Sequence, residues 1–192
     1  MKKIIGFDKW LFGKINQDGA NDFFDLVMPF LRVPSFWLPF YLFLFVLLLL
    51  NFKKRSLPIM LLLGATASAT DLISSRLIKP GFGRLRPCND PELSSSIRML
   101  AEYCGQNGSF TSSHAANHFG IAMFLFIVLK PFWGNWCWIF FAWAFVVCYA
   151  QVYIGVHFPF DIAGGAVLGC TMGWLMAGIY QKYFAIKNNP VL

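Results

Sequence analysis

Long apolar segments constrain this chain more than any other feature. They cover residues 34–50, 57–78, 114–129, 136–156 and 158–183. A helix needs about 20 apolar residues to cross a bilayer, and several of these segments are longer than an ordinary core helix. Charged residues make up only 13% of the chain, whereas a soluble domain carries about 25%. We therefore predict an integral membrane protein.

The expected fold is an all-α, polytopic membrane helix bundle that forms a single domain over residues 1–192. The transmembrane bundle is predicted for residues 34–183, with five spans. Residues 1–33 mix apolar and charged side chains, and a break at Asp18-Gly19 predicts two short helices that lie in the membrane interface. The alternative is that the segment from Phe23 onward crosses the membrane as a sixth span.

The net charge of +7 indicates which partners to expect. Most basic residues sit at the ends of apolar segments or in one loop, which suits a lipid bilayer with anionic headgroups. We expect no nucleic acid partner, because no basic-aromatic pattern of a nucleic-acid module is visible, and the sequence indicates no oligomeric state. The positive-inside rule makes one group of cations cytoplasmic. That group is Lys53, Lys54, Arg55, Lys130, Lys182 and Lys187.

The polar residues 79–113 form a loop on the opposite side of the membrane. Its position predicts a bacterial inner membrane protein whose site faces outward, although Lys9 and Lys14 fall on that outer side as well. Cys88 and Cys104 share the loop, and in an oxidising compartment we expect a disulfide between them. On a cytoplasmic loop they would instead remain free thiols.

Small residues recur at every fourth position of the last apolar segment. They are Gly165, Gly169, Gly173 and Ala177. Such a stripe is typical of close packing between helices in membranes. It therefore predicts a packing surface and not a chemical site.

Three cations lie close together where the polar loop begins. Lys79, Arg84 and Arg86 fall among two glycines and two prolines, which favour a fixed bend. Arginine can bind two phosphate oxygens at once, and lysine supplies a point charge. We expect Lys79 and Arg86 to meet at one phosphate group. Asp71 and Arg76 lie just upstream and need partners at membrane depth, either each other or, for Asp71, a cation of the loop.

The loop ends in a serine pair directly before an apolar segment. This is a helix N-cap signal, and a helix N-terminus attracts anions through its free backbone N–H groups. Ser112 and Ser113 are expected to cap the helix or to bind phosphate. His114 would lie in the first turn. His118 would lie one turn deeper on the same face, as a buried partner rather than a catalytic residue.

His157 and Asp161 are spaced by one helical turn at the last turn signal of the chain. Pro159 suits the first turn of a helix, so His157 would precede that helix and Asp161 would lie just inside it. A carboxylate that accepts from one imidazole nitrogen makes the other more nucleophilic. Alone, the pair would equally suit a helix cap.

Together, these segments resemble the type 2 phosphatidic acid phosphatase superfamily. Its first motif, Lys, six residues and Arg-Pro, matches residues 79–87 without a gap. Its second motif, Pro-Ser-Gly-His, is similar to Thr111-Ser112-Ser113-His114. Its third, Ser-Arg, five residues, His, three residues and Asp, is similar to residues 150–161, with Gln151 in place of Arg. The resemblance runs from the second predicted span to the fifth.

The resemblance implies a metal-independent lipid phosphatase without a cofactor. His157 would attack phosphorus to give a phosphohistidine, and Asp161 would orient it. His114 would protonate the leaving oxygen and then activate water. The phosphoryl oxygens would be held by preorganised donors, namely Lys79, Arg86, Ser112 and backbone N–H groups near Ser113.

Two departures from the family pattern affect the expected site. Gln151 replaces an arginine, so one phosphate cation is missing and only an amide donor remains. Arg84 and Arg98 lie in the same loop and are candidates to replace that charge. Ser113 stands where the family has glycine, which removes some backbone freedom at the phosphate turn.

The expected partner is a phosphorylated membrane lipid. Polyprenyl diphosphate, phosphatidylglycerol phosphate, phosphatidic acid and lipid A are all compatible. One alternative is transfer of the phosphoryl group to another lipid. Others are a metal or haem protein that uses its histidines, and a non-catalytic lipid-binding protein. A metalloprotease-type helix would need glutamate directly after His114. Ala115 stands there, which argues against such a metal site.

Overall fold

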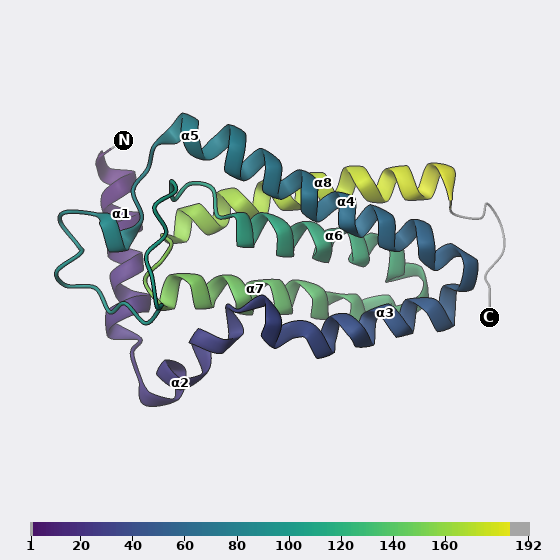
Figure 1. Ribbon diagram of the computed structural model, residues 1–192, viewed down its shortest axis with the longest axis horizontal. Coiled ribbons are helices and arrows are strands. Elements are labelled where there is room, and N and C mark those ends of the chain that lie inside the picture. The colour runs from purple at the N-terminus through teal and green to yellow at the C-terminus, as the bar shows by residue number, and fades with distance from the viewer. Residues whose placement is uncertain (1, 185–192) are drawn as a thin grey trace.

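The computed structural model describes residues 2–184, and its regular structure over this range is helical throughout. Five helices run along the long axis of the molecule (Figure 1), namely α3 (Leu38–Phe52), α4 (Ser56–Leu72), α6 (Ser113–Trp133), α7 (Trp138–Tyr153) and α8 (Pro159–Tyr183). Helix α1 (Lys2–Gly13) lies across one end of this bundle, where the polar loop also gathers. The all-α prediction is thus confirmed.

Three helical stretches are long and apolar enough to cross a membrane, namely Pro34–Asn89, Ser113–Tyr153 and Pro159–Tyr183. The first two reverse direction within themselves (Figure 1). The reversals fall at η3 (Lys53–Arg55), where Lys53 has a φ of 48°, and at η6 (Gly134–Cys137), where Gly134 has a φ of 55°. The count of five or six spans stays a prediction.

Helices α6 and α8 form the closest pair in the bundle. A Cβ atom at Gly169 would lie 2.3 Å from the Ala116 carbonyl oxygen, and one at Gly173 would lie 2.3 Å from the Gly120 carbonyl oxygen. Only glycine permits this approach, so the predicted packing role of the stripe is confirmed. Both helices begin at the end of the bundle that α1 covers (Figure 1), which brings their N-termini together.

The two helices predicted before the bundle are present. Helix α1 continues through η1 (Lys14–Asp18), and α2 (Asp22–Leu31) follows after a break at Gly19. They pack on the end of the bundle through apolar contacts. Phe12 meets Phe158 with ring centroids 5.4 Å apart, and Met28 lies in a buried cluster with residues of α7.

The polar loop begins later than predicted. Helix α4 continues through η4 (Ile73–Ile78) into the short helix α5 (Lys79–Phe82), so Lys79 lies on a helix. Proline is tolerated in the first turn of a helix, and Pro80 stands there. Gly83 then ends α5 in a left-handed conformation with a φ of 56°, and this residue provides the predicted bend.

Candidate active site

His157 and Asp161 form a buried pair at the N-terminus of α8. The ring Nδ1 of His157 lies 3.4 Å from Asp161 Oδ2, and the two side chains are 2% and 0% exposed. The same oxygen accepts the backbone N–H of Phe158 at 2.9 Å and the hydroxyl of Ser109. Burial lowers the pKa of His157 to about 4, although Asp161 favours the charged form. The ring is therefore neutral at pH 7.

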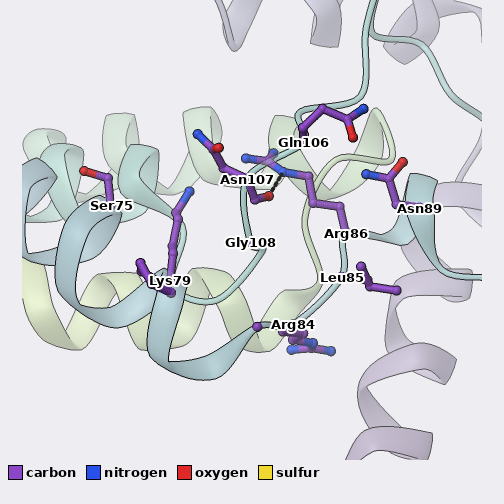
Figure 2. Close-up of a pocket in the computed structure, with 11 residues that line it drawn as sticks. Ser75, Lys79, Arg84, Leu85, Arg86, Asn89, Gln106, Asn107 and Gly108 are labelled. Carbon is purple, nitrogen blue, oxygen red and sulfur yellow. Dashed lines mark hydrogen bonds between the residues drawn. The ribbon is translucent and has the colours of Figure 1, made fainter.

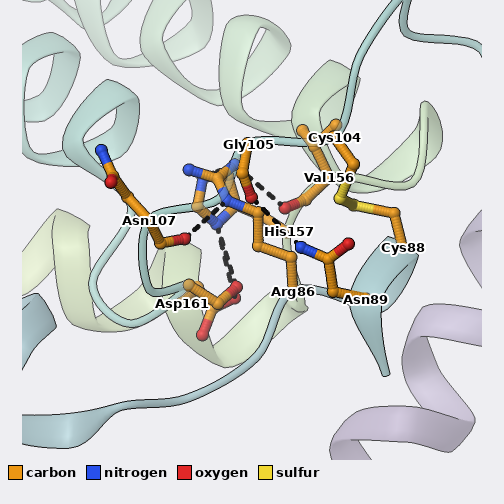
Figure 3. The surroundings of a disulfide bond; sticks show 10 residues. Arg86, Cys88, Asn89, Cys104, Gly105, Asn107, Val156, His157 and Asp161 are labelled. Atoms are coloured by element: carbon orange, nitrogen blue, oxygen red, sulfur yellow. Dashed lines mark hydrogen bonds and ion pairs between the residues drawn. A yellow bond between two sulfur atoms is a disulfide. The ribbon is translucent and has the colours of Figure 1, made fainter. Parts of the chain in front are cut away.

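Arg86 faces the other ring nitrogen of His157. Its Nη1 lies 3.4 Å from His157 Nε2 and 3.4 Å from the Val156 carbonyl oxygen, and its Nε donates to the Asn107 carbonyl oxygen at 3.1 Å (Figure 3). Because a guanidinium only donates, this network assigns the proton of the ring to Nδ1 and a lone pair to Nε2. The nitrogen with the lone pair faces a cation.

A cavity of about 350 Å³ opens beside Arg86. Lys79 and Arg86 both border it, and their side chains lie on the same side of the polar loop (Figure 2). Lys79 is only 7% exposed and has no ion pair within residues 2–184. Two unneutralised cations at one cavity form a suitable site for a phosphate group.

Asp71 and Arg76 do not form an ion pair with each other. Asp71 lies at the end of α4 and Arg76 lies on η4, and both are exposed. Neither has an oppositely charged group within 4 Å in the described part of the chain. Asp71 is instead among the charges that act on Lys79. Asp71 forms no ion pair with a cation of the loop within residues 2–184, so the second predicted alternative stays a prediction.

The serine pair occupies the start of α6 as predicted. Ser112 is the N-cap, and its hydroxyl accepts the N–H of Ala115 at 3.4 Å, while its own N–H donates to the Asp161 carbonyl oxygen at 3.0 Å. The Ser113 hydroxyl lies 3.0 Å from that of Ser74. The predicted cap is confirmed, and the cap also joins α6 to the turn that carries Asp161.

His114 lies in the first turn of α6, and its ring stacks with that of His118 at a centroid distance of 6.3 Å. His118 lies one turn deeper and is 7% exposed. Its Nδ1 donates to the His114 carbonyl oxygen at 2.8 Å, and its ring centroid lies 4.8 Å from that of Trp143. His118 is thus a buried partner, as predicted.

A disulfide joins Cys88 and Cys104, with Cα atoms 6.1 Å apart (Figure 3). Cys88 follows Arg86 by two residues, and Cys104 precedes the segment that contacts the Arg86 guanidinium. A Cβ at Gly105 would lie 3.0 Å from the Arg86 Cζ, and Asn107 supplies the carbonyl oxygen that Arg86 binds. The bridge therefore ties together both segments that hold Arg86.

Gln151 stands where the family has an arginine, and Arg84 and Arg98 were the candidates to replace that charge. The three side chains have different surroundings. Gln151 is 1% exposed, and its Nε2 has no hydrogen-bond partner among the residues that the structure describes. Arg98 pairs with Asp25, away from Lys79 and Arg86. Arg84 donates to Asp161 Oδ1 at 2.9 Å, and so contacts the His157–Asp161 pair.

The sequence did not reveal three residues that the structure brings to the site. Ser109 is fully buried and donates to Asp161. Asp8 of α1 is fully buried and accepts from Arg84. Arg32, directly after α2, has no ion pair in residues 2–184, and its charge acts on both Arg86 and His114. The only signal for Asp8 was its position as a lone acid on an apolar helix.

A family model covers most of this site. The model of the PAP2 superfamily matches residues 58–185. The chain belongs to the PAP2 superfamily. That segment contains Lys79, Arg86, His114, His157 and Asp161. The PAP2 match thus agrees with the resemblance found in the three motifs.

Named relatives place the chain among membrane lipid phosphatases of the PAP2 type. It is 34% identical over 169 residues to a lipid A 4'-phosphatase of Bacteroides thetaiotaomicron, covering 86% of this chain and 73% of the relative. A lipid A 4'-phosphatase of Porphyromonas gingivalis is 30% identical over 139 residues, which cover 70% of this chain and 57% of the relative.

Two solved structures share the fold of this PAP2 protein. One is the phosphatidylglycerolphosphate phosphatase of Bacillus subtilis, with a TM-score of 0.69 at 22% identity and coverage of 97% of this chain and 90% of that one. The other is LpxE of Aquifex aeolicus, with a TM-score of 0.64 at 24% identity and coverage of 88% and 93%. Both matches support the fold described above.

Proposed function

We propose that this protein removes the phosphate of a phosphomonoester from a membrane glycolipid of the lipid A type, without a metal and through a phosphohistidine. One observation carries the proposal. The neutral ring of His157 presents Nε2 to the Arg86 side of the site while Nδ1 faces Asp161. A nucleophile with an orienting carboxylate and a phosphate-binding cation are the parts that phosphoryl transfer through histidine needs.

The proposed reaction has two balanced steps. The Nε2 lone pair of His157 attacks phosphorus and forms an N–P bond, while the bond from phosphorus to the lipid oxygen breaks and that oxygen takes a proton from His114, which enters the reaction as an imidazolium beside the anionic phosphate. Water then gives a proton to His114 and attacks phosphorus, so the N–P bond breaks and inorganic phosphate leaves. Lys79 and Arg86 stabilise the charge on the non-bridging oxygens in both steps.

The serines and Gln151 would assist as hydrogen-bond donors. Ser112 fixes the start of α6, which directs the free N–H groups near Ser113 and His114 toward the phosphate. Gln151 is buried with an unpaired amide nitrogen, and an unpaired buried donor is costly unless a ligand binds it. We assign this donor to a phosphoryl oxygen, where the family has an arginine.

The substrate class rests on the names of the two relatives, which are both lipid A 4'-phosphatases. Lipid A is therefore favoured over the other lipid phosphates considered from the sequence. The disulfide supports a loop that faces an oxidising compartment. We therefore place the protein in a bacterial inner membrane with the site facing outward.

The test is phosphate release from a panel of lipid phosphates by purified protein in detergent, with and without EDTA. The wild type should release phosphate from a lipid A phosphomonoester in both conditions, and His157→Ala should release none. Arg76→Gln is the control, because Arg76 is an exposed cation upstream of Lys79 that has no ion pair in the described part of the chain. Rapid quenching at alkaline pH should recover phosphate on the wild-type protein but not on His157→Ala.

Three results would each remove part of the proposal. Release that stops with EDTA would contradict metal independence. Recovery of the phosphate on a second lipid would mean phosphotransfer in place of hydrolysis. If a folded wild-type protein releases phosphate from no lipid, the phosphatase function itself is wrong.

A further inference from the structure

Helix α1 carries a buried acid beneath an exposed apolar face. Ile4, Phe7 and Trp10 are 60%, 51% and 56% exposed, whereas Asp8 on the same helix is 0% exposed. Burying a carboxylate is costly unless it is paired and hydrogen-bonded. Burial raises the pKa of Asp8, and a hydrogen bond from Arg84 opposes this effect. The partners of Asp8 therefore explain how the helix tolerates it.

Both oxygens of Asp8 contact the active-site end of the bundle. Oδ1 accepts the backbone N–H of Phe160 in the first turn of α8 at 2.9 Å, and Oδ2 accepts Arg84 Nη2 at 2.6 Å. The Arg84 guanidinium also lies 4.2 Å from the centroid of the Phe158 ring. Arg84 is thus held by a carboxylate on one side and an aromatic ring on another.

Arg84 is the partner of the second oxygen of Asp161. Oδ2 of Asp161 accepts from Phe158, Ser109 and the His157 ring. Within residues 2–184, Oδ1 is bound by Arg84 alone, at 2.9 Å. A carboxylate held at one oxygen can still rotate about its last side-chain bond, and a donor at the second oxygen prevents that rotation.

From this arrangement we infer that Asp8 and Arg84 are positioning residues for the His157–Asp161 pair, so that the N-terminal helix completes the active site. Arg84 fixes the plane of the Asp161 carboxylate. Asp8 fixes Arg84 and shares its positive charge, which leaves Asp161 more of its negative charge to orient the His157 ring. The inference rests on the proposed function, because it assigns these residues to the same reaction.

A direct role of Arg84 in phosphate binding fits the geometry less well. Arg84 borders the cavity, but its guanidinium turns away from the side chains of Lys79 and Arg86 (Figure 2). Both of its terminal nitrogens already donate to carboxylates. A phosphate would meet a guanidinium that two carboxylates already neutralise, whereas Lys79 has no ion pair within residues 2–184.

The experiment compares Asp8→Asn, Arg84→Gln, Arg84→Lys and the double variant Asp8→Asn/Arg84→Gln in the full chain, with lipid A phosphate release as the assay. Lys9→Gln is the matched control. Lys9 follows Asp8 on α1 and joins that helix to the loop through ion pairs with Asp90 and Glu92. Within the described residues it has no ion pair with Asp161.

We expect Arg84→Gln to lower kcat by 10- to 100-fold, on the order found for partners that orient a reacting group, with KM within about twofold of wild type. Arg84→Lys should restore part of kcat. Asp8→Asn keeps the shape of the side chain and should lower kcat less. In the Arg84→Gln background Asp8→Asn should have no further effect, because residues that act through one another are not additive.

A rise in KM with kcat unchanged would make Arg84 a substrate ligand and overturn the inference. Wild-type kcat in Arg84→Gln, or additive losses in the double variant, would also overturn it.

If the wild type releases no phosphate from any lipid, the proposed function is rejected. A spectroscopic measurement then still tests the inference. The chain has 3 histidines, so ¹⁵N shifts of histidine-labelled protein can report the tautomer of His157. We expect a dominant Nδ1–H form in wild type and Lys9→Gln, and a smaller Nδ1–H fraction in Arg84→Gln, where Arg86 still faces Nε2. An unchanged tautomer in Arg84→Gln would show that Arg84 does not position the pair.

Discussion

Replacing Gly169 by alanine should move the two halves of the site apart. The added Cβ would lie 2.3 Å from the Ala116 carbonyl oxygen, whereas ordinary contact begins at 3.4 Å. Since the obstacle is helix backbone, α8 must retreat from α6 by about 1 Å, which is the difference between these distances. Such overpacking costs about 1–3 kcal/mol of folding stability.

The displacement matters for activity because the two helices carry different parts of the site. Helix α6 carries Ser112 and His114, and α8 carries Asp161. A misplacement of about 1 Å at reacting groups can cost on the order of 100-fold in rate. We therefore expect Gly169→Ala to lower kcat/KM by 10- to 100-fold, although no catalytic atom is changed.

The assay is lipid phosphate release together with thermal unfolding in the same detergent. Gly178→Ala is the control on the same helix, since nothing lies within 4 Å of its would-be Cβ. The folding stability of Gly178→Ala should equal that of wild type or exceed it by up to about 1 kcal/mol, because alanine has a higher helix propensity than glycine. Wild-type kcat/KM and melting temperature in Gly169→Ala would refute the reasoning.

Three further predictions follow from the site. The pKa of His157 is about 4 in the folded protein against an ordinary 6.5, so kcat/KM should hold until the pH nears 4. Below pH 6.5, His157 takes up a proton more readily in the unfolded chain than in the folded protein, so melting temperatures should fall as the pH drops from 6.5 toward 4. An acid limb of kcat/KM near 6.5 would contradict the low pKa of His157. Reducing the Cys88–Cys104 bridge, which has a sequence separation of 16, should lower stability by about 3 kcal/mol and raise KM, because Arg86 loses its support. Unchanged kinetics after verified reduction would count against that role. Arg32→Gln should raise KM about 3- to 10-fold, as expected for loss of about 1 kcal/mol of attraction between charges, with kcat little changed. An equal effect in Arg76→Gln would show that bulk charge and not position is responsible.

The sequence predicted the features that depend on local pattern. The helix of residues 114–129 and its cap at Ser112 follow from a serine pair before an apolar run, and the cap is present. The start of α8 follows from Pro159, which occupies its first turn. The meeting of Arg86, His157 and Asp161 was expected from three motifs on one membrane face, and the structure brings them together.

The remaining features depend on contacts between distant parts of the chain. Lys79 was expected in a loop because Pro80 and Gly81 follow it, but packing extends the helix as far as Phe82. Arg84 was one of two candidates for a phosphate cation, and one of its two carboxylate partners, Asp8, lies 76 residues away in the sequence. Local pattern carries no information on such a pairing.

The contact between Asp8 and the backbone of Phe160 has a consequence for biosynthesis. The two residues are separated by 152 positions. Chains fold from the N-terminus as they are synthesised, so α1 is made before α8, and until α8 has been made Asp8 has only one of its two partners, Arg84. The site can be assembled only after nearly the whole bundle has entered the membrane. A stalled or truncated product that lacks α8 should therefore be unable to attack the phosphorylated lipids of the membrane that receives it.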